Sequence, residues 1–365
     1  RVKIIINLTN CIFVIMIVNI HKIFKLNSIN YNREELINFA NNNIESQNSN
    51  SLILSEFILE IFNNASFILC KTSGSTGKPK CIKLEKKSLV NSTYMTRDYF
   101  NLTPGKSAIS FLPLSFIAGK MMLIRAMVLG LDLHLFNPTS NPSKFIDKNY
   151  FFSAMTPMQA SNSINKLKYI NTLILGGGYV SKKLRLKILS EKNKYFETYG
   201  MTETATHIAI KKVSKEYALN NNFSVLKGVS ISANKNNCLV IEAPHISVNK
   251  LITNDIVKIT SQGEFILLGR IDNIINSGGL KLIPEEIEEK LTHSISERFI
   301  ISSVDSELLG AKVVLIIESK RYKLQQDVFK YLSKFETPKK IYFIDRFVYT
   351  KTNKIDRLKT TKFIN

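Results

Sequence analysis

Cysteine is scarce in this sequence. Four cysteines stand at positions 11, 70, 81 and 238 of 365 residues. Their scattered positions match neither a disulfide framework nor a set of metal ligands, so neither can be the basis of the fold. Cysteines scattered in this way are typical of proteins in a reducing compartment, so we expect a cytoplasmic protein.

Long hydrophobic runs are also missing, with one exception near the N-terminus. Residues 4–20 are largely apolar, but Asn7, Asn10 and Asn19 interrupt them and no small-residue cleavage site follows. One interpretation is a signal peptide or a membrane anchor. We favour the other, in which residues 1–15 precede the true start at Met16. We therefore expect a soluble protein with no stable membrane insertion.

Acidic residues are few: 29 Asp and Glu face 50 Lys and Arg, which leaves a net charge of +21. Such a charge often marks a protein that binds nucleic acid or an anionic membrane. Here the lysines are spread along the whole chain among many asparagines and isoleucines. We therefore predict a solvated basic surface and no nucleic-acid partner.

Strands and helices are predicted to alternate, which indicates a mixed α/β fold with substantial parallel sheet. Two helices are expected within residues 31–64, and further helices at 88–100, 118–129, 285–291 and 324–333. Strands are expected at 107–112, 131–136, 151–155, 171–175, 195–198, 239–243, 251–260, 264–268, 299–303, 312–318 and 341–344. The predicted organisation is a large α/β domain, residues 1–270, followed by a small mobile α+β domain, residues 271–365.

One polar loop stands between two predicted strands and carries the strongest chemical signal. It contains Thr72, Ser73, Gly74, Ser75, Thr76, Gly77 and Lys78. Glycines let successive backbone N–H groups point into one concavity, which suits phosphate oxygens, and the hydroxyls and lysine add donors and charge. The loop is not a Walker A motif, because only two residues separate Gly74 from the Gly77-Lys78 pair.

A second motif, Tyr199-Gly200-Met201-Thr202-Glu203, follows a predicted strand at its carboxyl end, where α/β sheets bind ligands. Glu203 offers a hard oxygen ligand for Mg²⁺, and Thr202 offers a hydroxyl for a phosphate. A run of three glycines, Gly176, Gly177 and Gly178, follows another strand.

Together these motifs resemble the adenylate-forming enzymes, the superfamily of acyl-CoA synthetases, luciferases and peptide-synthetase adenylation domains. The matching motifs run in the family's order from Thr72 to Arg357, so the resemblance covers nearly the whole chain. What is missing is most of the large subdomain that typical acyl-CoA synthetases place before the phosphate loop.

The resemblance implies a role for each matching residue. It implies that ATP binds at the Thr72–Lys78 loop, at the three glycines, at Tyr199 and Gly200, at Asp255 through the ribose, and at Arg270. It implies that Thr202 and Glu203 serve the phosphate and magnesium, and that Asp272 is a hinge. Asn254 stands where the family has a glycine.

The remaining implied roles concern CoA and catalysis. Gly278 and Gly279 are expected to let the backbone approach CoA. Lys354, in Asn353-Lys354-Ile355-Asp356-Arg357, resembles the catalytic lysine of the superfamily, whose charge stabilises the α-phosphate as a carboxylate attacks. The implied cofactor is Mg²⁺, with ATP and CoA as co-substrates.

Three further stretches narrow the resemblance: Phe111-Leu112-Pro113 with Ile117 to Met122, Gly200 to Thr204 followed by His207-Ile208-Ala209, and Ile275 to Gly279. Within the superfamily they most resemble the short o-succinylbenzoate–CoA ligases of menaquinone biosynthesis. That similarity implies an aromatic dicarboxylate substrate whose second carboxylate needs a donor or a cation. We expect Lys120, at a predicted helix N-terminus, and His207 to supply it. Arg125 lies five positions beyond Lys120 and points to a different helix face.

Three alternatives stay open. The enzyme could activate another aryl or fatty acid, or it could load a carrier protein instead of CoA. A basic nucleic-acid-binding protein is the third, for which the sequence offers charge but no motif. The sequence does not indicate an oligomeric state.

Overall fold

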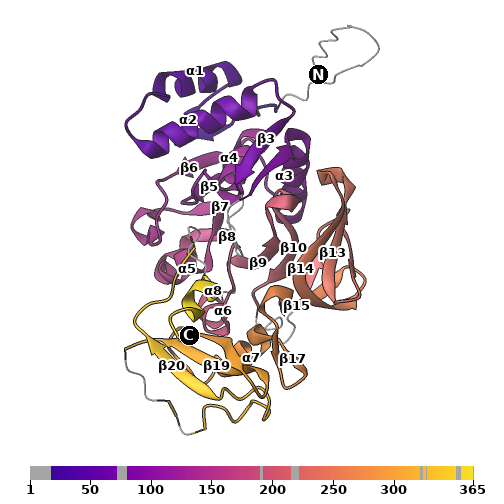
Figure 1. Cartoon of the computed structure of the whole chain (residues 1–365). Coiled ribbons are helices and arrows are strands. Elements are labelled where there is room, and N and C mark those ends of the chain that lie inside the picture. The colour runs from indigo at the N-terminus through magenta and orange to yellow at the C-terminus, as the bar shows by residue number, and fades with distance from the viewer. Residues whose placement is uncertain are drawn as a thin grey trace.

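The structure is a computed structural model, and it describes residues 18–71, 80–189, 192–214, 222–320, 324–325, 327–350 and 355–364. Within these ranges it forms a large upper body and a smaller lower body (Figure 1). No helix in the described ranges is both long enough and apolar enough to cross a bilayer.

One large sheet runs through the upper body. Its 13 strands among the described residues lie in the order β12-β13-β14-β15-β11-β10-β9-β8-β7-β5-β6-β1-β2. Their bounds are β1 Lys25–Leu26, β2 Ile29–Asn30, β5 Ser107–Ser110, β6 Asp132–Leu135, β7 Tyr150–Met155, β8 Ile170–Leu175, β9 Lys194–Gly200, β10 His207–Lys212, β11 Phe223–Val225, β12 Ser230–Ala233, β13 Cys238–Ala243, β14 Val248–Ser261 and β15 Glu264–Arg270.

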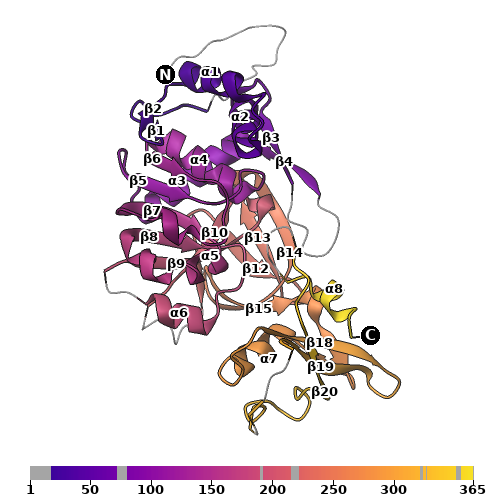
Figure 2. The same ribbon diagram turned by 90° about the vertical axis from the view of Figure 1, so that its left-hand side faces the viewer.

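The half of this sheet from β1 to β9 is built from parallel pairs, as the alternation of strands and helices predicts. Figure 2 shows β1, β6, β5, β7, β8 and β9 stacked in that order. Neighbouring positions of one strand point to opposite faces, so Ile174 joins one hydrophobic core while Leu173 and Leu175 join another. Both faces of the sheet are therefore covered.

Four helices cover the two faces. Buried residues of α3, Lys86–Phe100, and α4, Ile117–Leu129, belong to the core that contains Ile174. Buried residues of α5, Pro157–Ser161, and α6, Lys182–Ile188, belong to the core that contains Leu173. Gly130 ends α4 in the left-handed region, as its position in the sequence predicts.

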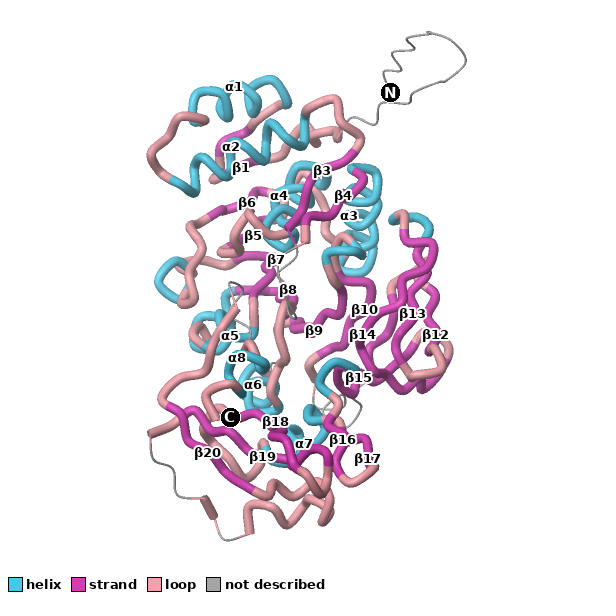
Figure 3. Tube along the Cα trace, in the orientation of Figure 1, coloured by secondary structure: helices cyan, strands magenta, loops and turns pink. Residues whose placement is uncertain are grey.

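Two further helices and a hairpin lie at the top of the molecule (Figures 1 and 3). The helices are α1, Arg33–Asn43, and α2, Ser49–Phe62, which confirms the two helices predicted there. The hairpin pairs β3, Phe67–Lys71, with β4, Cys81–Glu85, in antiparallel register. Pairing of Lys71 with Cys81 closes the ends of the predicted phosphate loop, whose residues 72–79 lie outside the described ranges.

The lower body has its own sheet. It consists of β16 Ile275–Ser277, β17 Leu280–Leu282, β18 Phe299–Ser306, β19 Gly310–Glu318 and β20 Lys340–Ile344. Strand β19 is buried on both faces, since Leu315 and Ile317 pack with α7, Pro284–Leu291, while Val314 and Ile316 pack with Phe347. Helix α8, Arg357–Thr361, lies beside β18.

One predicted helix, 324–333, is wrong. Its described residues form consecutive turns, with amide hydrogen bonds from Val328, Lys330 and Leu332 to carbonyls three positions earlier. Its apolar residues still pack on the small core, where Val328 is buried. The spacing of the apolar residues in this segment therefore reflects their burial in the core and not the formation of a helix.

Candidate active site

A cavity of about 1110 Å³ lies between the large sheet and the lower body. One wall comes from the carboxyl ends of β8 and β9 and from β14 and β15. The other comes from α7 and from residues on both sides of the gap at 351–354. A cavity at the carboxyl ends of parallel strands is where α/β folds usually bind ligands.

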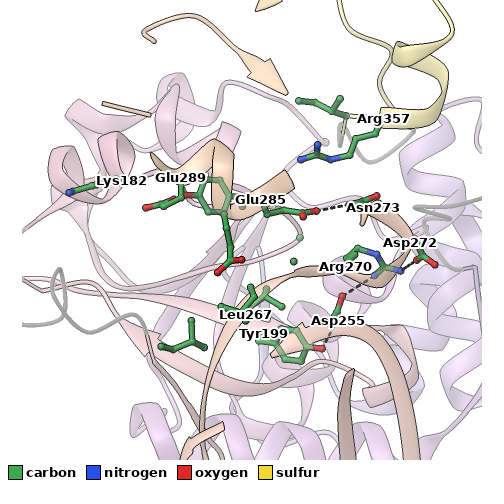
Figure 4. Close-up of a pocket in the computed structure, with 18 of the residues that line it drawn as sticks. Lys182, Tyr199, Asp255, Leu267, Arg270, Asp272, Asn273, Glu285, Glu289 and Arg357 are labelled. Atoms are coloured by element: carbon green, nitrogen blue, oxygen red, sulfur yellow. Dashed lines mark hydrogen bonds and ion pairs between the residues drawn. The ribbon is translucent and has the colours of Figure 1, made fainter. Parts of the chain in front are cut away.

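The floor of the cavity holds a hydrogen-bonded carboxylate. Tyr199 donates its hydroxyl proton to Asp255 Oδ2 at 2.6 Å, and Arg270 Nη1 donates to Asp255 Oδ1 at 3.0 Å (Figure 4). Burial, followed by the charge of Asp255, raises the pKa of Tyr199, so its hydroxyl stays a donor. The tyrosine at the end of β9 thereby orients an acidic side chain from β14.

The arginine also reaches the predicted hinge. Arg270 Nη2 lies 2.8 Å from Asp272 Oδ2, and Asn254 Nδ2 lies 3.2 Å from both oxygens of the same carboxylate. Burial alone would lower the pKa of Arg270, but the hydrogen bond to Asp272 and the two carboxylate charges raise it overall. The structure thus brings Asp255, Arg270 and Asp272 together in one network.

The glycine-rich turn after β8 forms another side of the cavity. Gly177 and Gly178 line it, and a side chain at Gly177 would meet nothing within 4 Å. Gly177 has a φ of +76°, which favours glycine. Gly176 lies just behind, where an added Cβ would meet the Thr198 hydroxyl at 2.8 Å. The open backbone of this turn leaves room for a flat ring system.

The turn after β9 carries Thr202 and Glu203. Gly200 lines the cavity, while Thr202 and Glu203 stand beyond it in a short 3₁₀ turn, Thr202–Thr204. Glu203 is exposed, so its carboxylate is free of the protein core. An exposed carboxylate of this kind fits Mg²⁺, which proteins usually bind through one or two carboxylates and which keeps waters and substrate phosphates as its other ligands.

Two predicted parts of the site lie outside the described residues: the loop Thr72–Lys78, and Lys354. Residues on both sides of the segment that contains Lys354 are described. Thr350 and Ile355 both line the cavity, together with Arg357. The predicted CoA residues, Gly278 and Gly279, lie in the turn between β16 and β17 with φ of +58° and +82°, and they do not line the cavity.

Lys120, which was predicted to serve a substrate carboxylate, contacts other groups of the protein in this structure. Its Nζ lies 2.7 Å from Glu60 Oε2 and 3.3 Å from the carbonyl of Leu69, and it sits over the ring of Phe57. This buried ammonium already has a carboxylate partner and holds α4 against α2 and β3. The prediction that it serves a substrate carboxylate finds no support in these contacts.

His207 is buried at the start of β10, and its Nε2 has no hydrogen-bond partner among the described residues. Burial, followed by the charge of Arg125, holds the pKa of His207 well below its usual range. The imidazole is therefore neutral, and it can donate one hydrogen bond.

Several contacts of the site were not predicted from sequence. Arg185 of α6 pairs with Glu197 of β9, which also accepts from Lys211 of β10 at 3.0 Å. Asn254 donates a hydrogen bond to Asp272. The sequence did carry a signal for this contact, because Asn254 stands where the family has a glycine. The pairings of Arg185, Glu197 and Lys211 join residues far apart in sequence, so spacing carried no signal for them.

Comparison with known proteins places these observations among relatives. The family described as "AMP-binding enzyme" matches residues 60–225. A solved structure from Dyadobacter fermentans, an acyl-CoA synthetase (AMP-forming)/AMP-acid ligase II-like protein, is 30% identical with a TM-score of 0.57. The match covers 89% of this chain and 97% of that one.

Curated relatives are more distant. The 2-succinylbenzoate–CoA ligases of Geobacillus sp. and Haemophilus influenzae are each 25% identical, over 78% and 70% of this chain. The chain spans 66% and 60% of their lengths. The fold is similar to that of O-succinylbenzoate Coenzyme A Synthetase from Bacillus subtilis in complex with ATP and magnesium ion, with 18% identity and a TM-score of 0.68, covering 84% of this chain and 74% of that one.

Proposed function

The chain belongs to the family of AMP-binding enzymes, and we propose that it is an ATP-dependent acid–CoA ligase that activates 2-succinylbenzoate. In the first half-reaction a carboxylate oxygen attacks the α-phosphate of ATP, and acyl-adenylate and pyrophosphate form. In the second the thiol of CoA attacks the acyl carbon, and AMP leaves. The observation that carries the proposal is the Tyr199–Asp255–Arg270 network in a cavity that the glycine turn leaves open.

The cavity can hold the nucleotide through three kinds of contact. Asp255 offers carboxylate oxygens to ribose hydroxyls, and the backbone of Gly177 and Gly178 offers a flat surface for the base. Arg270 supplies positive charge beside them. The loop from Thr72 to Lys78 is proposed to bind the outer phosphates through its backbone N–H groups.

Thr202 and Glu203 are proposed to act at the α-phosphate. The Thr202 hydroxyl would donate to a phosphate oxygen, and the Glu203 carboxylate would hold Mg²⁺. When bound, the metal ion supplies positive charge that stabilises the developing negative charge. Lys354 is proposed to add a second cation there, and Ile355, next to it in the chain, lines the cavity.

A change of domain orientation is proposed to separate the half-reactions. Residues 1–270 and 271–365 form the two domains, and Asp272 absorbs the rotation between them. Gly278 and Gly279 lie away from the cavity, so a rotation has to bring them to it before CoA reacts. The conformation described here then corresponds to the adenylate-forming step.

The substrate is proposed from the curated relatives and from one buried donor. Those relatives are named as 2-succinylbenzoate–CoA ligases, and the Nε2 atom of His207 has no hydrogen-bond partner among the residues that the structure describes. We propose that His207 donates to the substrate. The described cysteines, Cys70, Cys81 and Cys238, are free, which supports the cytoplasm as the proposed compartment.

The test is ATP–pyrophosphate exchange across a panel of carboxylic acids, with benzoate and fatty acids beside 2-succinylbenzoate. We expect exchange with 2-succinylbenzoate above all other acids and loss of it in Lys354→Ala. The same variant should still form thioester from preformed acyl-adenylate, because the lysine acts at the phosphate. Exchange with another acid alone would change the substrate, and no exchange with any acid would overturn the ligase.

A further inference from the structure

The hairpin that leads into the proposed phosphate loop is not part of the large sheet. Among the described residues β3 pairs only with β4, so the outer edge of β3 has no neighbouring strand. Figure 2 shows β3 and β4 beside α2, outside the stack of parallel strands. The backbone hydrogen bonds of the large sheet therefore do not fix the position of this hairpin.

Two charged side chains take the place of the missing strand at Leu69. The Oε1 atom of Glu60, on α2, accepts a hydrogen bond from the Leu69 amide at 2.7 Å, and Lys120 Nζ, on α4, donates to the Leu69 carbonyl at 3.3 Å. The two side chains also bind each other, with 2.7 Å between Lys120 Nζ and Glu60 Oε2. One ion pair thus holds both backbone groups of a residue that stands just before the loop.

This ion pair is largely shielded from water. The exposed fractions of the Lys120 and Glu60 side chains are 10% and 26%. The Lys120 ammonium also lies 4.6 Å from the centre of the Phe57 ring, and Phe57 is itself buried on α2. Water and salt screen an ion pair in such surroundings less than a pair on the surface. Its attraction therefore counts for more than that of an exposed pair.

Lys120 stands at a fixed place on the large body. It lies in the first turn of α4, next to Gly119, which packs directly against the Pro113 carbonyl. The residues that follow it on α4 are buried in the same core as Ile174 of β8. One path of contacts from the parallel strands to the hairpin therefore runs through α4 and Lys120.

Packing alone does not account for this pair. Leu69 is 48% exposed, so its side chain does not anchor the strand. Two apolar side chains at positions 60 and 120 would avoid the cost of taking charges out of water, but they could not bind the Leu69 backbone. A carboxylate and an ammonium supply one acceptor and one donor at the same place, which is what an unpaired strand residue needs.

We propose that Glu60 and Lys120 are positioning residues, which hold β3 against α2 and α4 so that the loop after β3 meets the outer phosphates of ATP. The proposal rests on the proposed function for the role of that loop. Neither residue lines the cavity. The pair therefore acts through the backbone of β3 and not on the substrate.

The two half-reactions should depend on this pair differently. The outer phosphates of ATP take part only in the first half-reaction, since they leave as pyrophosphate before CoA reacts. A misplaced loop should therefore slow adenylate formation and spare thioester formation from preformed acyl-adenylate. A general loss of folded protein would lower both half-reactions by the same factor.

The test compares four variants. Glu60→Met and Lys120→Met each remove one partner, and the double variant removes both. Arg33→Met is the matched control, because Arg33 lies over the ring of Phe62 and donates to the Phe62 carbonyl at 3.1 Å. It therefore braces α2 by the same kinds of contact that Lys120 makes, but at the other end of the helix from β3's ion pair partner Phe57.

Four measurements are made on each variant. They are ATP–pyrophosphate exchange, single-turnover thioester formation from preformed acyl-adenylate, denaturant unfolding, and amide hydrogen exchange over residues 66–71. The last of these reports on β3 directly and needs no activity.

We expect each single variant to lower kcat/KM for ATP in the exchange reaction by about 10- to 100-fold, since small misplacement of catalytic groups has effects of that size. Thioester formation should stay within about twofold of the wild type. Amide exchange over residues 66–71 should become faster in both single variants and in the double variant.

The double variant separates positioning from stability. It should be more stable than either single variant, because no unpaired charge remains. It should not regain exchange activity, because the Leu69 amide and carbonyl still lack their partners. Arg33→Met should lose some stability but keep both half-reactions within about twofold of the wild type.

The outcomes distinguish this proposal from the proposed function. A wild-type protein without exchange activity contradicts the ligase, while amide exchange over residues 66–71 still reports whether the ion pair holds β3. Unchanged amide exchange in both single variants would overturn the positioning role. So would equal losses in the two half-reactions, or a double variant that regains exchange activity together with its stability.

Discussion

The side chain of Arg357 connects three elements of the lower body. Its two terminal nitrogens lie 2.7 and 2.6 Å from the two oxygens of Glu288, and Nη1 also donates to the carbonyl of Ile301 at 3.0 Å. Burial raises the pKa of Glu288, and the charge of Arg357 opposes that effect. The pair joins α8 to α7 and β18, next to the segment that carries Lys354.

Removing Arg357 alone should cost far more than removing the whole pair. Arg357→Met leaves a partly buried carboxylate without its partner, so we expect a loss of up to about 3 kcal/mol in the free energy of unfolding. Arg357→Met combined with Glu288→Met should recover most of it. Denaturant unfolding measures both variants, and a double variant as unstable as the single one would show that packing, not charge, is lost.

At the scale of elements, the Arg185–Glu197–Lys211 cluster joins α6, β9 and β10 behind the cavity. It holds two cations, the buried Lys211 and the partly buried Arg185, for one carboxylate. Burial lowers the pKa of Lys211 to about 8, although the charge of Glu197 works in the other direction. In the folded state Lys211 therefore loses its proton at a lower pH than in the unfolded chain, although it is still mainly protonated at pH 7.

This shift predicts a pH dependence of stability. In the unfolded chain the pKa of a lysine is about 10.4. Between pH 8 and that value the unfolded state binds more protons, so the folded wild type gains stability as the pH rises. Lys211→Met lacks that gain, and the wild type's advantage over it should grow by about 1–3 kcal/mol across the window. Urea unfolding at a series of pH values measures it.

Lys212→Met is the control for this series, since Lys212 is exposed on the same strand. Its difference from the wild type should stay constant with pH. A constant difference for Lys211→Met as well would contradict the lowered pKa of Lys211.

Helix α4 depends on a glycine in its first turn. Gly119 packs directly against the backbone carbonyl of Pro113, so an added Cβ would collide with backbone that cannot rotate away. Gly119→Ala should therefore lose about 1–3 kcal/mol of stability, even though alanine favours helix by about 1 kcal/mol. Ala118→Gly, at the exposed neighbouring position, should lose about 1 kcal/mol or less. Thermal unfolding is measured for both variants. If Gly119→Ala is the more stable of the two, the collision of the added Cβ with the Pro113 carbonyl is contradicted.

For the whole molecule, the contacts of Asp272 hold the start of the connection between the two sheets against the large sheet. Arg270 holds its carboxylate from the end of β15, and Asn254 holds it from β14. Asp272 itself begins the connection to the lower body, whose first strand starts at Ile275. If Asp272 is the hinge, as proposed, these contacts stabilise the orientation described here relative to a rotated one.

Asn254→Gly should weaken that preference. Loss of exposed hydrogen bonds is a small change, so we expect thioester formation from preformed acyl-adenylate to become about two- to fivefold faster. Adenylate formation should not become faster. Single-turnover measurements with CoA test this, and Asn254→Asp, which places a like charge beside Asp272, should act in the same direction. A rate equal to the wild type in both variants would show that Asn254 does not restrain the hinge.

Much of the fold could be predicted because local patterns carry it. The strands of the parallel half, the two N-terminal helices and the end of α4 at Gly130 follow from alternation, apolar spacing and turn residues. The helix predicted at 324–333 was wrong because the apolar residues at this spacing can be buried equally well by consecutive turns. Tyr199 and Arg270 could be identified because each stands in a motif at a strand end, and Asp255 because its motif resembles one of the family, although it lies within β14.

The sequence by itself determined where the chemistry stands along the chain, since glycines, strand ends and motif spacing are local properties. Which charged groups meet was decided by the tertiary structure. Lys120 pairs with Glu60 and Arg125 contacts Thr206 because packing of α4 brings distant segments to it. The energy of a buried charge depends on its surroundings, and those exist only once the chain has folded.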